Sequence, residues 1–110
     1  MYVDASSTKK GVATLHNLSN GQKVSHTFTT TPSTLCETNA EWIVEDFESG
    51  GNLVPFANFG SITFTDASAK GSSGTVTPSG GTIIDIRDQS GKILTDCGIS
   101  GSNAYCHYTG

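Results

Sequence analysis

The sequence predicts an all-β fold of antiparallel strands, arranged as a sandwich or a barrel. Glycine contributes 13 of the 110 residues, serine and threonine are abundant, and hydrophobic residues make up only 35%. This composition is poor for helices and suits short strands joined by tight turns. Most segments alternate apolar and polar residues with a period of two, and turn signals follow one another closely. At this length we expect a single domain over residues 1–110.

The first expected element is a hairpin of residues 11–17 and 22–29 around Asn20-Gly21, which is a strong hairpin-turn signal. A two-residue loop there predicts that Leu15 lies opposite His26. This register separates apolar from polar side chains, which supports the pairing. The expected apolar face holds Ala13, Leu15, Val24 and Phe28, and the expected polar face holds Thr14, His16, Ser25 and Thr27.

After this hairpin, the chain alternates between expected strands and expected loops. The expected strands cover residues 39–47, residues 61–65, and a second hairpin of residues 82–87 and 92–96 around Gln89-Ser90-Gly91. The expected loops are a Thr/Ser/Pro linker over residues 29–38, a turn over residues 49–52 and a loose Ser/Gly stretch over residues 67–81. Residues 54–59 are expected to be a core segment with a proline at a sheet edge.

The three cysteines are an odd number, and the spacing of the last hairpin predicts which two of them pair. A two-residue loop at Gly101-Ser102, of type II′, places Cys97 directly opposite Cys106. Opposed residues of antiparallel strands lie within the Cα separation that a disulfide tolerates. We therefore predict a Cys97–Cys106 disulfide, and Cys36 is left without a partner in this chain.

Charge and hydropathy exclude several classes of function. Six basic and ten acidic residues give a net charge of −4, which argues against nucleic-acid partners. No apolar run approaches the roughly 20 residues of a membrane span, so we expect no membrane partner. The chain opens without the basic and apolar stretches of a secretory leader. Disulfides in a small Ser/Thr-rich chain nevertheless favour a secreted protein.

Motifs for metals, cofactors and serine nucleophiles are missing from the sequence. His16, His26 and His107 lie on separate predicted strands without metal-ligand spacing, so we expect no metal. No Gly-x-Ser-x-Gly and no glycine-rich phosphate loop occurs, and we expect no cofactor. Asn17-Leu18-Ser19 matches the acceptor pattern for N-glycosylation.

The most unusual stretch is residues 39–47, which carries three carboxylates within six residues of an otherwise apolar strand. Strand alternation places Glu41, Ile43, Glu45 and Phe47 on one face and Trp42, Val44 and Asp46 on the other. Each carboxylate must be solvated, paired or held in a site. Two interpretations stay open: an edge strand that uses charges against aggregation, and a functional site.

The same stretch, Glu41-Trp42-Ile43-Val44-Glu45-Asp46-Phe47, followed by Leu53-Val54-Pro55-Phe56-Ala57-Asn58-Phe59-Gly60, resembles the glutamic peptidases of fungal type, the eqolisins. The resemblance extends to the first hairpin, to residues 61–66 and to the spacing of Cys97 and Cys106, and it covers essentially the whole chain. It is confined to the C-terminal half of the family, whose members are about twice as long.

The resemblance implies a lectin-like antiparallel β-sandwich, of which this chain is about half, and an acid-acting, pepstatin-insensitive endopeptidase of the secreted, fungal type. It implies that Glu45 is the catalytic glutamate. We expect Glu41, Asp46 and Glu48 to be structural or supporting. The family's catalytic glutamine, and the cysteine that pairs with the one matching Cys36, lie in the other half. Polypeptides are the implied substrate.

The mechanism that the resemblance implies is physically reasonable. A carboxylate activates water as a general base, and a side-chain amide orients that water and donates to the developing oxyanion. An ordinary glutamate titrates near ~4.3, so such a base can ionise in acid. Only Gln22 and Gln89 are present, both beside predicted turns, and we expect neither to replace the missing glutamine.

Three hypotheses therefore follow for the chain. It is a catalytic half that is inactive alone and needs an N-terminal half, a non-catalytic lectin-like binding module, or a self-associating remnant that pairs with a second copy. Half a sandwich leaves unpaired strand edges and an uncovered apolar face, which favour association.

Overall fold

The computed structural model describes residues 1–110, except for the side chain of Ser6. The chain divides into two compact units, Met1–Ala40 and Glu41–Gly110. In this described part, ten strands form four antiparallel sheets and no helix occurs, so the prediction of an all-β antiparallel fold is confirmed. The strands are β1 (Tyr2–Ser7), β2 (Lys10–His16), β3 (Lys23–Phe28), β4 (Glu48–Ser49), β5 (Asn52–Leu53), β6 (Ser61–Phe64), β7 (Ala69–Gly71), β8 (Gly74–Val76), β9 (Thr95–Ser100) and β10 (Asn103–Tyr108). One domain over residues 1–110 remains a prediction.

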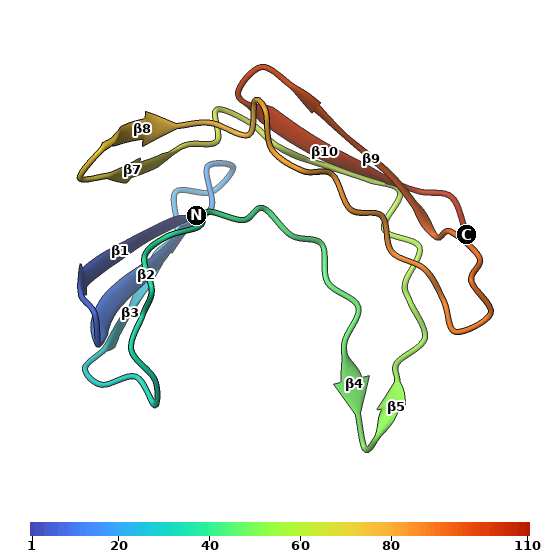
Figure 1. The fold of residues 1–110 in the computed structure, drawn as a ribbon, viewed down its shortest axis with the longest axis horizontal. Coiled ribbons are helices and arrows are strands. Elements are labelled where there is room, and N and C mark those ends of the chain that lie inside the picture. The colour runs from blue at the N-terminus through green and yellow to red at the C-terminus, as the bar shows by residue number, and fades with distance from the viewer. The chain divides into compact units, whose positions relative to one another are not determined.

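The first unit is built on the sheet β1-β2-β3, in which β2 is central (Figure 1). The predicted hairpin is present, but its predicted register is wrong by two residues: Leu15 pairs with Val24, not with His26. The loop is longer than two residues because the N–H of Asn17 donates to the carbonyl of Gln22 at 2.8 Å. A shift of two residues keeps each side chain on its predicted face, since strand side chains alternate with a period of two.

Two asparagine side chains account for the longer turn. Asn17 Oδ1 accepts the N–H of Ser19, and Asn20 Oδ1 accepts the N–H of Gln22, each at 3.0 Å. These side-chain bonds occupy backbone N–H groups that could otherwise pair between the two strands. The turn therefore covers residues 18–21, and Asn20-Gly21 forms its second half instead of a two-residue loop. Beyond β3, the predicted linker carries Cys36, which is exposed and free.

The second unit contains the sheet β6-β10-β9, and β9 and β10 form the last hairpin (Figure 1). Its predicted register is confirmed, with Cys97 opposite Cys106. The two cysteines are joined by a disulfide, with their Cα atoms 4.0 Å apart. Gly101 has a φ of 58°, which the first position of the predicted type II′ turn requires. The predicted strand over residues 61–65 is β6.

The hairpin around Gln89-Ser90-Gly91 is confirmed as a turn, but its predicted strands are too long. Pairing of residues 82–87 with 92–96 is limited to one bridge, between Arg87 and Ile93, and to nearby backbone bonds. Asp88 Oδ1 accepts from the hydroxyl and the N–H of Ser90 and from the N–H of Lys92. The Ser90 hydroxyl first, and then these backbone groups, hold the pKa of Asp88 below its ordinary value.

Residues 82–87 are held to β9 largely by side chains. The hydroxyl of Thr95, a residue only 1% exposed, accepts the N–H of Ile86 at 2.9 Å and donates to Asp85 Oδ1 at 3.1 Å. The same carboxylate oxygen accepts the N–H of Cys97 at 2.8 Å. Because these hydrogen bonds use the side chains of Thr95 and Asp85, residues 82–87 lie along β9 without forming a strand paired with it.

Two further predictions are corrected. Residues 67–81 are not loose throughout, because β7 and β8 form a hairpin there, joined through Ser72-Ser73. Residues 39–47 are not assigned as a strand. A β-strand needs a second strand whose backbone forms hydrogen bonds with it. The alternation of side chains in residues 39–47 predicts an extended backbone but does not predict such a partner strand.

The chain buries little apolar surface. Ala67, which is 7% exposed, is the one buried hydrophobic residue in the described part, and the exposed area is 8351 Å². A compact domain of 11.4 kDa exposes about 5,800 Å², and two separate bodies of the sizes of the two units would expose about 6,900 Å². The chain therefore presents well over 1,000 Å² more surface than folded bodies of this size normally do.

Candidate functional site

The segment Glu41–Phe47 runs as an extended coil into β4 (Figure 1). Burial along it alternates with a period of two, which confirms the predicted division into two faces. The exposed side chains are Glu41, Ile43, Glu45 and Phe47, and the half-buried ones are Trp42, Val44 and Asp46. Within the described part of the chain, the backbone groups of Glu41–Asp46 make no hydrogen bond. The segment therefore has the side-chain arrangement of a strand and lacks its ladder.

The C-terminal end of this segment is fixed by a tight hairpin. The carbonyl of Phe47 accepts the N–H of Val54 at 3.1 Å, and β4 pairs with β5 directly beyond it. Gly50 and Gly51 have φ values of 64° and 82°, as the two central residues of a type I′ turn require. The predicted turn over residues 49–52 is thus confirmed. The hairpin that it closes fixes the backbone at Phe47, two residues after Glu45.

Glu45 is exposed, and no hydrogen bond to another described residue engages its carboxylate. Its exposed neighbours on the same face are apolar: Ile43 is 58% and Phe47 is 57% exposed. Asp46 differs, because its Oδ1 is buried and lacks a hydrogen-bond partner among the described residues. A buried carboxylate oxygen without a donor is costly, so Asp46 is a position at which a further polar group would be stabilising.

Aromatic side chains support the chain that follows the hairpin. The Phe56 and Phe59 rings lie 5.7 Å apart, and the Tyr108 ring of β10 lies 6.0 Å and 6.2 Å from them. The N–H of Tyr108 donates to the carbonyl of Gly60 at 2.8 Å. All three rings are half-buried, but Pro55, Ala57 and Asn58 are exposed and residues 54–59 belong to no strand, so the predicted core segment with a proline at a sheet edge is present only in its aromatic side chains.

The three histidines lie on three different strands, β2, β3 and β10. His16 and His26 lie on opposite faces of the first sheet, and within the described residues no three His, Cys, Asp or Glu side chains gather as for a metal ion. His107 Nδ1, however, lies 2.6 Å from Ser61 Oγ. Alternation in the sequence does not predict this contact, because it depends on the pairing of β10 with β6, whose contacting residues are 46 positions apart.

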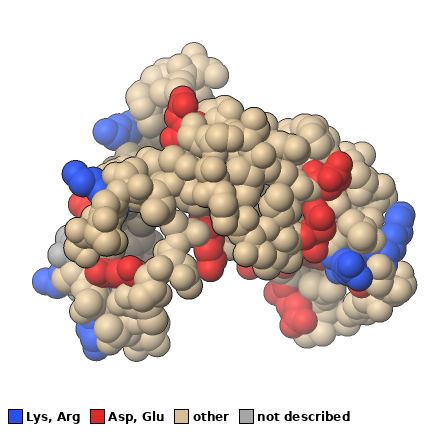
Figure 2. All heavy atoms as spheres, turned by 45° about the horizontal axis from the view of Figure 1, so that its top comes forward, with Lys and Arg blue, Asp and Glu red and all other residues tan. Residues whose placement is uncertain are grey.

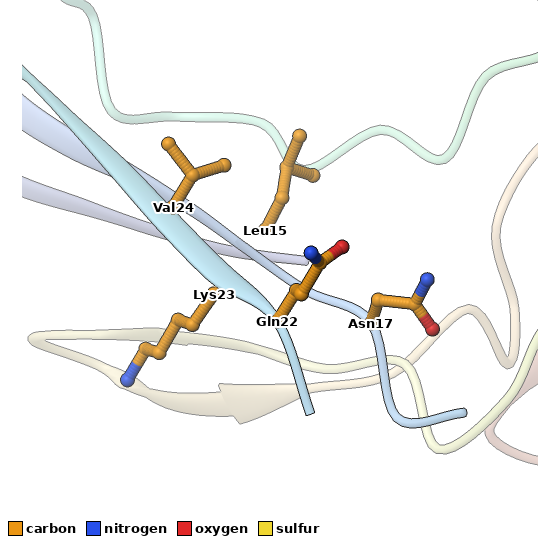
Figure 3. A pocket seen from close by; sticks show the side chains of 5 residues that line it. All are labelled: Leu15, Asn17, Gln22, Lys23 and Val24. Carbon is orange, nitrogen blue, oxygen red and sulfur yellow. The ribbon is translucent and has the colours of Figure 1, made fainter. Parts of the chain in front are cut away.

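A shallow hollow of about 420 Å³ lies at the end of the β2–β3 hairpin and is lined by Leu15, Asn17, Gln22, Lys23 and Val24 (Figure 3). Of the predicted site residues, only Asn17 borders it. On the face in Figure 2, most of the surface is uncharged and the Lys and Arg side chains are dispersed. Of the described residues, none belongs to a helix long and apolar enough to cross a bilayer.

Comparison with known proteins places these features in a family. Residues 1–108 match the Peptidase A4 family. Aspergillopepsin-2 of Aspergillus niger is 52% identical over 107 residues, which are 96% of this chain and 38% of that protein. Scytalidopepsin B of Scytalidium lignicola is 43% identical over 118 residues, covering 98% of this chain and 44% of that protein. The chain thus spans less than half the length of these curated relatives.

Solved structures of glutamic peptidases match the fold of this chain. The crystal structure of aspergilloglutamic peptidase from Aspergillus niger matches with a TM-score of 0.90 and 51% identity, covering 98% of this chain and 64% of that one. Scytalido-glutamic peptidase with a peptide-based transition state analog matches with a TM-score of 0.87 and 39% identity, covering 97% and 56%. With its antiparallel strands and the Trp42–Phe47 sequence, the chain belongs to the Peptidase A4 family, the glutamic peptidases or eqolisins.

Proposed function

We propose that this chain provides the general base, Glu45, of a secreted endopeptidase that hydrolyses polypeptides in acid. The observation that carries the proposal is the position of Glu45 in a member of a glutamic peptidase family. Its carboxylate is exposed and unengaged, on the face where Ile43 and Phe47 offer apolar surface to a substrate. The Cys97–Cys106 disulfide supports an oxidising, extracellular location.

In the proposed reaction, the Glu45 carboxylate takes a proton from a water molecule as the water oxygen bonds to the scissile carbonyl carbon. Negative charge moves to the carbonyl oxygen, where a side-chain amide donates a hydrogen bond. The carbon–nitrogen bond then breaks, and Glu45 returns the proton to the leaving amine. Removing one oxyanion donor costs about 10² to 10³ in rate in other enzymes, so the amide is as necessary as the base.

The chain's two glutamines are poor candidates for that amide. Gln22 is part of the β2–β3 turn, where its Oε1 accepts from Asn20 Nδ2 at 3.0 Å, and Gln89 lies in the turn before Ile93. We infer that the donor comes from a polypeptide corresponding to the residues of the relatives outside the matched region. The unbonded backbone of Glu41–Asp46 and the unpartnered Asp46 Oδ1 support such a neighbour.

A complementation experiment tests this function. The chain is mixed with the residues of aspergillopepsin-2 that lie outside the match, and cleavage of a denatured protein is followed at acid pH with pepstatin present. We expect each part alone to be inactive and the mixture to cleave, with a mixed disulfide through Cys36 as an additional product. A complex that forms without cleaving would contradict the catalytic role, and cleavage by the chain alone would contradict the need for an external amide.

The large exposed area favours a second candidate, a self-associating remnant that pairs with a second copy. The excess surface of one chain exceeds the roughly 800 Å² that each partner buries in a standard interface, and unpaired edges favour strand addition. Light scattering is then expected to give a mass above the monomer that rises with concentration. Phe47→Asp should lower that mass, whereas Leu18→Asp, at an 84% exposed turn position, should not. A concentrated monomer would exclude this candidate.

A further inference from the structure

We propose that Asn17 is an N-glycosylation site and that its first sugar lies against Leu15 and Val24. This proposal is independent of the role of Glu45. The acceptor pattern Asn17-Leu18-Ser19 lies entirely in the turn between β2 and β3, and all three residues are exposed. An acceptor in a protruding hairpin turn is accessible to a transferase, unlike one inside a sheet.

The turn also orients the acceptor side chain. Asn17 Oδ1 accepts the N–H of Ser19 at 3.0 Å, which fixes the carboxamide by its oxygen. Nδ2, the atom that glycosylation modifies, is on the opposite side of the carboxamide and makes no hydrogen bond within the described residues. By contrast, Asn20 in the same turn uses both of its polar atoms, donating to Gln22 Oε1 and accepting the Gln22 N–H.

The face from which Asn17 projects carries two exposed apolar side chains beside Gln22. Asn17 directly follows the last residue of β2 and is two residues after Leu15, and Leu15 pairs with Val24, so these side chains share one face of the hairpin. Leu15 is 54% and Val24 is 63% exposed. Figure 3 shows their side chains pointing the same way, with Lys23 turned to the other side. They border the hollow of about 420 Å³, into which a sugar on Asn17 can place its apolar face.

In the proposed modification, Asn17 Nδ2 bonds to the anomeric carbon of an oligosaccharide carried on a lipid diphosphate. The bond from that carbon to the diphosphate oxygen breaks, the lipid diphosphate leaves, and the amide nitrogen loses one proton. The donor belongs to the secretory compartment, where the Cys97–Cys106 disulfide also forms. Covered by a glycan, Leu15 and Val24 lose contact with water and no longer favour non-specific association.

Expression behind a cleavable secretion leader in a yeast tests the site. Intact mass is measured before and after endoglycosidase, on both retained and secreted protein, and leader cleavage reports entry into the lumen. We expect one oligosaccharide on the wild-type chain, on Ser19→Thr and on the matched control Asn20→Gln. Asn17→Asp, which keeps the oxygen acceptor of the turn, and Ser19→Ala should carry none. Unmodified wild-type and Ser19→Thr chains that have entered the lumen would overturn the proposal, as would a glycan on Asn17→Asp.

The position of the first sugar is tested on glycoprotein trimmed to one residue. Nuclear Overhauser contacts are expected between the sugar ring protons and the methyl groups of Leu15 and Val24. A sugar without such contacts would contradict the second half of the proposal, while the mass measurement would still decide the first.

Discussion

Replacing Glu45 with Gln is expected to lower kcat/KM of the complemented enzyme by about 10² to 10⁴, the usual contribution of a general base. The glutamine keeps the size of the side chain and removes its ability to accept a proton. Because Glu45 is exposed and makes no hydrogen bond to the described residues, the substitution should leave the fold intact. The assay is peptide cleavage at acid pH in the presence of pepstatin.

Glu41→Gln is the matched control for this experiment. Glu41 lies on the same face as Glu45, four residues before it and also exposed, so the two variants lose the same charge from the same surface. We expect Glu41→Gln to change kcat/KM only a few-fold. Equal losses in both variants would indicate a general effect of surface charge, and full activity in Glu45→Gln would remove Glu45 from the mechanism.

A peptide-binding measurement separates a role of Glu45 in the chemical step from a role in holding the substrate. If Glu45 acts in the chemical step, complemented Glu45→Gln should bind a peptide inhibitor with nearly the wild-type Kd while failing to cleave. Loss of binding together with cleavage would instead place Glu45 among the residues that hold the substrate.

The parts of the fold that could be predicted from the sequence are those fixed by short-range geometry. The two-residue loop at Gly101-Ser102 sets the register that brings Cys97 opposite Cys106, and no distant residue enters that argument. The face assignment of Glu41–Phe47 was equally local, because alternation follows from an extended backbone. These predictions hold in the structure since nothing from outside the segment competes with them.

Other features depend on information that alternation does not carry. The β2–β3 register differs from prediction because the carboxamides of Asn17 and Asn20 capture backbone N–H groups in the turn. The contact between Ser61 and His107 requires knowing that β6 pairs with β10. For Glu45, the sequence predicted a place on one strand-like face and left open whether the carboxylate is solvated, paired or held in a site. Its proposed catalytic role rests on family membership, and Glu45→Gln tests it.

Removing the Cys97–Cys106 disulfide should have the second large effect, on stability rather than on chemistry. The bridge closes a loop with a sequence separation of 9. The chain-entropy relation for such a loop gives about 2.7 kcal/mol at 25 °C, or roughly a 100-fold increase in the opening equilibrium of the hairpin. We expect stability to fall outside the β9–β10 hairpin as well. The Cys97 N–H donates to Asp85, and β10 is the central strand of the sheet β6-β10-β9.

Amide hydrogen exchange of the double variant Cys97→Ser/Cys106→Ser measures this effect. We expect protection to fall by about 100-fold at the amides of β9 and β10, and to fall as well at Ile86, whose N–H donates to Thr95. Cys36→Ser is the matched control, since that thiol is exposed and free, and its exchange pattern should equal that of the wild type. Unchanged protection in the double variant would mean that the β6-β10-β9 ladder and the Thr95–Asp85 bonds hold this sheet without the bridge.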